Sequence, residues 1–255
     1  MSKFASYPSL AGRPVFVSGG GSGIGASIVE HFAEQGAKVG FVDIDEAVSA
    51  TLVDKIKAAG HPAPLFAKAD VRDLAAYQTT IDSMSAKLGA FTVLVNNAAR
   101  DDRHTIDQVT PAFWDERIAV NLRHQYFAIQ SVVPGMKKAG GGSIINFSSV
   151  SYHAMTPQLS VYQAAKAAVI GMTRGLARDL GPDNIRLNSL TPGWIMTQRQ
   201  IDLWLTPEAE AALMVAQCLK EKVYPPDIAR MVLWLAADDS RLVTAQNFVV
   251  DGGRM

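Results

Sequence analysis

The chain has 255 residues, a length typical of one large domain or two small ones. Because 48% of the residues are hydrophobic and 19% are charged, the composition excludes a disordered or low-complexity chain. The 24 Lys and Arg residues balance 24 Asp and Glu residues. No net positive charge therefore attracts nucleic acid or an anionic membrane, and neither is expected as a partner.

Residues that would indicate export, a membrane span or a metal centre are sparse. Cys218 is the single cysteine, and the five histidines lack the spacing of metal ligands, so we expect no internal disulfide and no metal site. The segment from Met1 to Leu10 lacks the basic start and apolar stretch of a signal peptide. No apolar run approaches the roughly 20 residues of a membrane span. We therefore expect a cytoplasmic enzyme or binding domain.

Short apolar segments alternate with segments of helical period from Pro14 to Asp251, and no linker interrupts them. This pattern predicts a single domain over residues 1–255. Several of the short segments are apolar without alternation, as expected for strands covered by helices on both faces. The predicted strands are Val15 to Ser18, Lys38 to Asp43, Leu65 to Ala69, Thr92 to Asn96, Ser143 to Ser148, Ile185 to Leu190 and Asn247 to Asp251.

The ends of several predicted helices are marked by glycines that stop a helix and by a proline that starts one. A strand–helix order of this kind predicts an α/β fold, a Rossmann-type doubly wound parallel sheet of about seven strands with helices on both faces. Ligands of such sheets bind beyond the carboxyl ends of the strands. The predicted helices are 24–35 before Gly36, 46–59 before Gly60, 74–88 before Gly89, a long fourth helix capped by Thr110 with Pro111 at its first position, and 161–180.

A glycine-rich segment from Ser18 to Gly25 joins the first strand to the first helix. Glycines at this place let a diphosphate approach the helix N-terminus, although such a run also suits a simple tight turn. The second strand ends in Asp43, about 20 residues further on, as a dinucleotide fold requires. A carboxylate there binds the adenosine ribose and repels a 2′-phosphate, which favours NAD over NADP. The alternative is that Asp43 is a helix cap or a surface acid.

Tyr162 and Lys166 lie four residues apart on the fifth predicted helix and therefore share a face. The Tyr-x-x-x-Lys spacing is unspecific by itself, but its place after the fifth strand brings it near the expected nicotinamide. Asp70 and Val71 end the third strand, where they are expected to meet the adenine. Asp70 is alternatively a cap of the following helix.

Together these residues resemble the short-chain dehydrogenase/reductase family over nearly the whole chain. The resemblance implies that Tyr162 is the acid/base, that Lys166 lowers its pKa and holds the nicotinamide ribose, that Ser149 orients the substrate oxygen and that Asn121 supports a water in the proton path. Ala99 departs from the family's glycine. The implied cofactor residues are Gly19, Ser22, Gly23, Ile24, Asp43, Ile44, Asp70, Val71, Asn97, Tyr162, Lys166, Pro192, Ile195 and Thr197.

The free energy by which the phenolate of Tyr162 must be favoured can be estimated. A free tyrosine has a pKa near 10, so bringing Tyr162 to about 7 takes roughly 4 kcal/mol of preference for the phenolate. A nearby ammonium and a positive nicotinamide ring have the right sign to supply it. The tyrosinate then removes an alcohol proton while hydride leaves the same carbon.

The substrate is expected to contact three stretches: the run from Arg100 to His104, the segment between Ser149 and Tyr162, and a loop at about 193–222. These stretches are polar and resemble those of NAD-dependent sugar 1-dehydrogenases of the family, the bacterial D-xylose type among them. The resemblance implies oxidation of an aldose to a lactone. The candidate sugar contacts are Ser149, His153, Tyr162, Gln163, Trp194 and Arg199.

Several of these contacts have alternatives. His153 would pack under the loop, Trp194 would touch only cofactor, and Arg199 would pair with Asp202 or Glu208. The Asp-Asp-Arg-His run is expected to be structural or to lie at an interface.

Two other functions are also open: a reductase of 3-oxoacyl thioesters or other ketones, and a non-catalytic dinucleotide-binding protein. The resemblance further implies a homotetramer packed through the fourth and fifth helices.

Overall fold

A single sheet of seven parallel strands, in the order β3-β2-β1-β4-β5-β6-β7, runs through the computed structural model, which describes residues 4–255. The prediction of a seven-stranded parallel sheet is confirmed, with strand ends within two residues of the expected ones. The strands are β1 Pro14–Ser18, β2 Lys38–Asp43, β3 Leu65–Lys68, β4 Val93–Asn96, β5 Gly142–Phe147, β6 Ile185–Pro192 and β7 Asn247–Val250.

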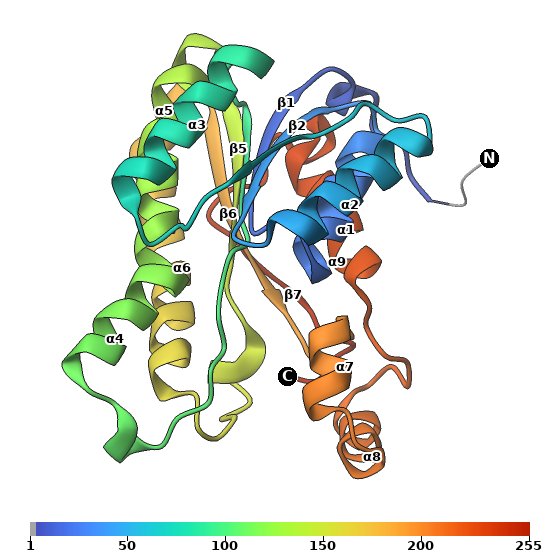
Figure 1. The fold of residues 1–255 in the computed structure, drawn as a ribbon, viewed down its shortest axis with the longest axis vertical. Helices are drawn as coiled ribbons and strands as arrows, with labels where there is room; N and C mark the ends of the chain where they lie inside the picture. Colours follow the sequence, from blue (N-terminus) through green and yellow to red (C-terminus); the bar gives the residue numbers. More distant parts are fainter. Residues whose placement is uncertain (1–3) are drawn as a thin grey trace.

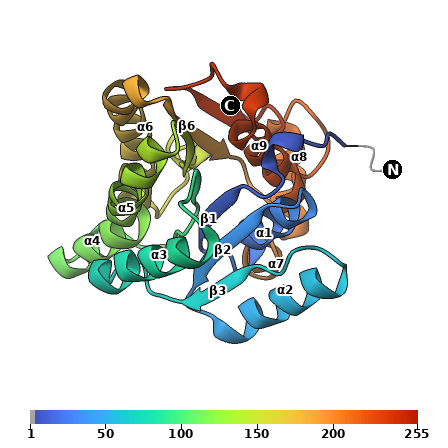
Figure 2. The same cartoon turned by 90° about the horizontal axis from the view of Figure 1, so that it is seen from above.

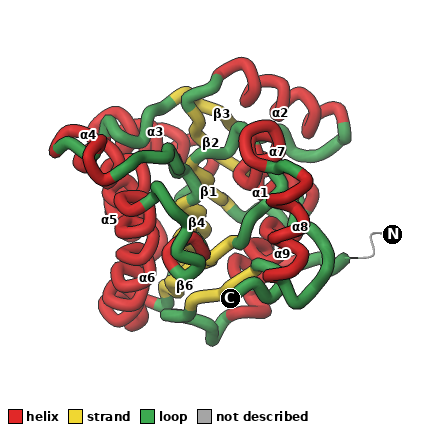
Figure 3. The backbone as a smooth tube through the Cα atoms, turned by 90° about the horizontal axis from the view of Figure 1, so that it is seen from below, coloured by secondary structure: helices red, strands yellow, loops and turns green. Residues whose placement is uncertain are grey.

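Helices cover both faces of the sheet. Figure 1 shows α3, α5 and α6 on one side and α1, α2 and α9 on the other, and the same two layers flank the strands in Figure 2. Seen from below, the strands form a central band between the two groups of helices (Figure 3). The helices are α1 Gly23–Glu34, α2 Glu46–Ala58, α3 Leu74–Leu88, α4 Pro111–Ile118, α5 His124–Lys138, α6 Ser160–Leu180, α7 Gln198–Trp204, α8 Pro207–Ala216 and α9 Pro225–Ala236.

Local signals in the sequence set several helix ends. The hydroxyl of Thr110 accepts a hydrogen bond from the amide of Phe113 at the start of α4, as its predicted capping role requires. The side chain of Asp73 caps α3, so the interpretation of Asp70 as that cap is wrong. No helix among residues 4–255 is long and apolar enough to cross a membrane.

The predicted long fourth helix is interrupted. A π-helical turn at Ala119–Arg123 separates α4 from α5, and Asn121 lies within it. Such a turn adds a residue to the helical repeat and so changes the direction in which the following side chains point. Hydrophobic periodicity averages over several turns, and it therefore does not reveal this interruption.

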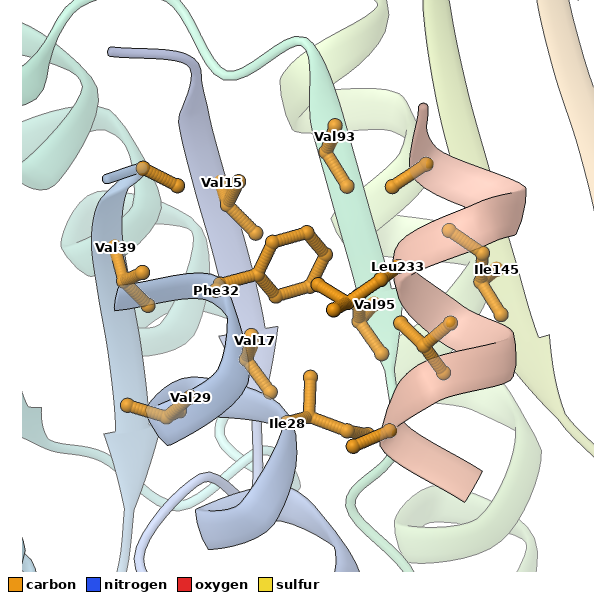
Figure 4. Packing of buried hydrophobic residues seen from close by; sticks show 14 of the residues in the cluster. Val15, Val17, Ile28, Val29, Phe32, Val39, Val93, Val95, Ile145 and Leu233 are labelled. Atoms are coloured by element: carbon orange, nitrogen blue, oxygen red, sulfur yellow. The ribbon is translucent and has the colours of Figure 1, made fainter. Parts of the chain in front are cut away.

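Alternate residues of the central strands enter two separate cores. Val15 and Val17 pack with α1 and α9, whereas Phe16 packs with α3 and α5 on the opposite face. Figure 4 shows the first core, with the ring of Phe32 directed from α1 toward the valines of the strands. Because both faces of the central strands are covered, β1 and β4 are apolar without alternation over most of their length, as their sequences indicated.

The strand order reverses between β1 and β4, which are neighbours in the sheet although β2 and β3 lie between them in the sequence. One connection from this pair crosses toward β2 and the other toward β5. The loops that follow β1 and β4 therefore diverge and leave a crevice at the carboxyl end of the sheet, where such folds bind ligands.

Candidate active site

A cleft of about 960 Å³ opens at this crevice. Its walls come from the loops after β1, β2, β3, β4, β5 and β6 and from α7. Seventeen of the twenty predicted site residues line it, and Asn121, His153 and Gln163 do not. The lining members are Gly19, Ser22, Gly23, Ile24, Asp43, Ile44, Asp70, Val71, Asn97, Ser149, Tyr162, Lys166, Pro192, Trp194, Ile195, Thr197 and Arg199.

The glycine-rich turn has a geometry that only glycine permits at Gly25, in the first turn of α1. A Cβ at Gly25 would lie 1.8 Å from the carbonyl oxygen of Gly19. The side-chain amide of Asn97 donates to that same oxygen over 2.8 Å and fixes the turn to the loop after β4. The hydroxyl of Ser22 makes no cap hydrogen bond at the start of α1. The turn thus leaves the helix N-terminus open to a phosphate, which fits a dinucleotide.

The carboxylate of Asp43 stands at the end of β2, on the wall of the cleft. It accepts hydrogen bonds from the backbone amides of Gly21 (2.8 Å) and Asp45 (3.1 Å). Asp45, and not Asp43, caps α2 through the amide of Val48. The helix-cap interpretation of Asp43 is therefore wrong, and its carboxylate is held beside the glycine-rich turn, where an adenosine ribose would lie in a dinucleotide site.

Asp70 and Val71 form the neighbouring part of the wall. Side-chain hydrogen bonds from Arg72 hold the pKa of Asp70 below its usual range, and the Nη2–Oδ2 distance is 2.6 Å. The same guanidinium reaches Glu116. Because its charge is already paired with Arg72, Asp70 adds little net negative charge to this end of the cleft.

The other end of the cleft holds the predicted catalytic side chains. Tyr162 and Lys166 project from α6, and the Lys166 ammonium lies 5.6 Å from the centre of the Tyr162 ring. Ser149, two residues after the end of β5, lines the cleft together with Tyr162, and its hydroxyl acts to lower the pKa of the Tyr162 phenol. Lys166 is almost fully buried and donates to the carbonyl oxygen of Phe147 over 2.8 Å. The resemblance's Ser, Tyr and Lys are thus brought together.

Asn121 lies behind this group and outside the cleft wall. Its side chain accepts from the amide of Arg100 (2.8 Å) and donates to the carbonyls of Arg100 and Arg117 (both 3.0 Å). These bonds tie the π-helical turn to the loop after β4. That Asn121 supports a water in a proton path stays a prediction. In the structure, its hydrogen bonds hold the loop after β4.

The charges of the chain alone do not lower the pKa of Tyr162. Burial raises the pKa of this phenol, the negative charge of Asp101 raises it further, and the Ser149 hydrogen bond and the charge of Arg103 lower it. Burial also lowers the pKa of Lys166 to about 7. Lys166 is not among the groups that shift the pKa of Tyr162 in the chain by itself, so its effect on the phenol stays a prediction.

The substrate side of the cleft is closed by contacts between the loop after β4 and α7. Arg199 pairs with Asp101 over 3.2 Å, so the interpretation that it pairs with Asp202 or Glu208 is wrong. Asp202 instead accepts from Gln198, one turn away on the same helix. The ion pair joins two segments that only the fold brings together.

Gln163 and His153 do not face the cleft. The Gln163 amide donates to the carbonyls of Ser151 (2.8 Å) and Thr156 (2.7 Å), which ties down the loop between β5 and α6. One helical step from Tyr162 turns its side chain away from the tyrosine's face. His153 is exposed, and its ring stacks on that of Tyr152 at 4.1 Å. Neither predicted substrate contact is placed to touch a molecule beside Tyr162.

Ala99 shows no backbone strain. Its φ is not positive, so replacement of the family's glycine leaves the loop unstrained.

The Asp-Asp-Arg-His run divides between structure and site. Asp102 pairs with the buried Arg117. The His104 ring accepts a hydrogen bond from the backbone amide of Val161 at the start of α6. Both contacts fit the structural role that was predicted for this run. Asp101 and Arg103, however, line the cleft.

Among the cleft-lining residues that were not named individually as site residues are Asp101, Arg103, Gln200 and Trp204. Arg103 stacks on the Trp204 ring at 4.8 Å. Their polar and aromatic character on stretches expected to meet the substrate was the available signal. No group of three or more His, Cys, Asp or Glu side chains within residues 4–255 is arranged to hold a metal ion.

Comparison with known proteins places these features in context. The family model described as enoyl-(acyl carrier protein) reductase matches residues 19–254. The chain is 49% identical to a probable galactose dehydrogenase of Rhizobium meliloti over 249 residues, 98% of this chain and 97% of that protein. It is also 49% identical to a D-xylose 1-dehydrogenase of Caulobacter vibrioides over 250 residues, 98% of both.

A solved structure gives the same picture of the fold. The crystal structure of a 3-oxoacyl-(acyl-carrier protein) reductase of Brucella melitensis with bound NAD superposes with a TM-score of 0.88. The two chains are 31% identical, and the match covers 100% of this chain and 98% of that one.

Proposed function

The chain belongs to the short-chain dehydrogenase/reductase family, and from that premise we propose that it oxidises the anomeric hydroxyl of a cyclic aldose to a lactone with NAD. One observation carries the proposal: a single cleft connects the glycine-rich turn to the Ser149–Tyr162 pair and ends at a polar rim. The two relatives that are 49% identical, named for galactose and D-xylose, support an aldose as the substrate.

The proposed reaction divides the work among a few side chains. Bound NAD supplies the hydride acceptor. Ser149 donates a hydrogen bond to the sugar oxygen and holds it beside Tyr162. The Tyr162 phenolate takes the hydroxyl proton as the anomeric carbon gives up hydride. Lys166 would hold the nicotinamide ribose, and its protonated form would favour the phenolate because an opposite charge lowers the phenol's pKa.

The proposal of NAD over NADP depends on Asp43. Its carboxylate is fixed by two backbone amides next to the glycine-rich turn, so it presents a fixed negative charge to the adenosine ribose. Two ribose hydroxyls satisfy this carboxylate as hydrogen-bond donors, whereas a 2′-phosphate is repelled.

A panel of aldoses tests the proposed reaction. Purified protein is mixed with NAD and each of D-xylose, D-galactose, D-glucose and L-arabinose, and formation of reduced nicotinamide is followed by its absorbance. We expect turnover with at least one aldose, and we expect Tyr162→Phe to remove it while NAD affinity stays within a few fold. Full turnover by that variant would refute the assigned base.

The rival reaction is tested with the same preparation. The family model's description and the Brucella melitensis structure favour a reductase as the second candidate. Oxidation of NADH or NADPH by 3-oxoacyl thioesters, together with no activity on any aldose, would replace the proposal by this alternative.

Assembly and location stay predictions of the sequence. Support for a homotetramer comes from an apolar groove on the outer surface of the helical layer, lined by Ile118, Leu122, Arg123, Tyr126, Phe127, Ala168 and Met172. We expect light scattering to give four times the mass of the chain, and a monomer mass would contradict this. The cytoplasmic location is likewise proposed from the sequence.

A further inference from the structure

The loop after β4 is held against the catalytic group on both sides of Asp101. On one side, the side chain of Asn121 binds both the amide and the carbonyl of Arg100. On the other side, Arg103 donates to the carbonyl of Pro157, and the amide of His104 donates to the carbonyl of Gln158. These bonds attach the loop to the π-helical turn and to the segment between Ser149 and Tyr162, so the position of Asp101 is fixed relative to the reacting end of the cleft.

The carboxylate of Asp101 lines the cleft and bridges to α7. One oxygen accepts from Arg199 at 3.2 Å and the other accepts from Gln200 at 3.1 Å. Gln200 in turn accepts from the indole Nε1–H of Trp194 at 2.9 Å. The side chain remains 23% exposed. A carboxylate has about four acceptor positions, and two donors leave the remainder free to bind a ligand in the cleft.

Asp101 also acts on the catalytic pair through space. Its negative charge raises the pKa of Tyr162 and that of Lys166, although burial is the largest influence on both groups. Asp102, the next residue, does not line the cleft and pairs with Arg100, with Arg117 and, at 3.8 Å, with Arg199. Of the two adjacent carboxylates, Asp101 is therefore the one directed to the reacting end.

We propose that Asp101 determines substrate specificity by accepting hydrogen bonds from ring hydroxyls of the aldose, with Arg199 and Gln200 holding its carboxylate in place. This inference rests on the proposed function and deepens it.

The chemistry of the group explains the preference. An ionised carboxylate only accepts hydrogen bonds, and hydrogen bonds from hydroxyls to a charged acceptor are stronger than neutral ones. Adjacent ring hydroxyls of a sugar supply two donors on one face. The carbonyl and thioester oxygens of a 3-oxoacyl substrate supply none, so binding of such a substrate beside Asp101 leaves the carboxylate partly desolvated without compensation.

A purely mechanical role is the competing explanation. Asp101 would then serve only to hold Arg199 and α7 in place, and its removal would weaken all substrates to the same extent. Contact with a sugar hydroxyl instead predicts that the loss depends on whether that hydroxyl is present.

The experiment compares Asp101→Asn with wild-type protein on an active aldose and on its 2-, 3- and 4-deoxy analogues, all of which keep the anomeric hydroxyl. We expect the substitution to lower kcat/KM for the full aldose by roughly 10- to 100-fold, the size of one hydrogen bond to a charged group. For at least one deoxy analogue the loss should be several fold smaller, because the contact is already missing. KM for NAD should stay within about twofold.

The matched control is Asp202→Asn. This substitution also removes one negative charge, but from a carboxylate on α7 that does not line the cleft. We expect wild-type kinetics from it. If Asp101→Asn does not fold, Asp101→Glu provides the same comparison, since it keeps the charge but displaces the carboxylate.

Each outcome has one meaning. An equal loss for the full aldose and all its deoxy analogues, or kinetics like those of Asp202→Asn, would overturn the role of Asp101. A wild-type protein that oxidises no aldose would instead overturn the proposed function, before any variant is compared.

Discussion

Replacing Lys166 by methionine should stabilise the protein without dinucleotide near pH 7, although it removes a side chain to which the proposed reaction gives a role. Burial lowers the pKa of Lys166 from 10.5 to about 7. At about 1.4 kcal/mol per unit, this difference means that the buried lysine lowers the free energy of unfolding by roughly 4 to 5 kcal/mol at neutral pH. Methionine has a similar length and carries no charge to desolvate.

The substitution also removes a hydrogen bond. Lys166 donates to the carbonyl of Phe147, and an unsatisfied buried acceptor costs about 1 to 3 kcal/mol. The net expectation at pH 7 is that Lys166→Met has a free energy of unfolding roughly 1 to 4 kcal/mol above that of wild type.

The pH dependence has a definite sign. Between the folded pKa of about 7 and the unfolded value of 10.5, the unfolded lysine binds more protons than the folded one, so wild-type stability rises with pH. The advantage of Lys166→Met should therefore shrink through this range. Above a pH of about 10 it should reverse, because only the lost hydrogen bond remains.

Urea unfolding without dinucleotide, in steps from pH 7 to pH 10, measures the difference. Lys57→Met, a matched change at an exposed lysine of α2, should show no comparable trend. A Lys166→Met protein that is less stable than wild type throughout, or a difference that does not change with pH, would refute the reasoning.

Three further predictions concern other parts of the chain. Gly25→Ala should reduce dinucleotide affinity at least tenfold by calorimetry, since the new Cβ would lie 1.8 Å from the Gly19 carbonyl oxygen, and unchanged affinity would contradict the role of the turn. Asp43→Ala combined with Ile44→Arg should shift the ratio of kcat/KM from NAD toward NADP, and an unchanged ratio would mean that this acid is not the selector. Thr110→Ala should lower the free energy of unfolding by about 1 kcal/mol, because the amide of Phe113 loses its cap, and equal urea midpoints would argue against this.

Features that depend on neighbouring residues were predictable from the sequence. The strand and helix order, the cap at Thr110 and the glycine-rich turn follow from local propensity, capping and backbone sterics. The shared face of Tyr162 and Lys166 follows from the helical repeat. The place of Asp43 after the second strand follows from the regular βα order. The residues at the dinucleotide end of the cleft are therefore ones that the sequence had already indicated.

Features that depend on distant or irregular contacts were not predictable in this way. The alternative weighed for Arg199 was a pair with Asp202 or Glu208 nearby in the sequence, yet it pairs with a residue 98 positions away. The π-helical turn at Asn121 is invisible to a periodic pattern, and Gln163 turns toward a loop carbonyl instead of the cleft.

The sequence by itself determined the strand and helix order, the glycine-rich turn and the spacing of Tyr162 and Lys166, because each follows from short-range patterns along the chain. Only the tertiary structure decided which polar groups face the reacting end of the cleft. The strand order brings the loop after β4 against α7, so Asp101 meets Arg199 and Gln200 there. Those partners depend on how the whole chain packs, and no local signal in the sequence specifies them.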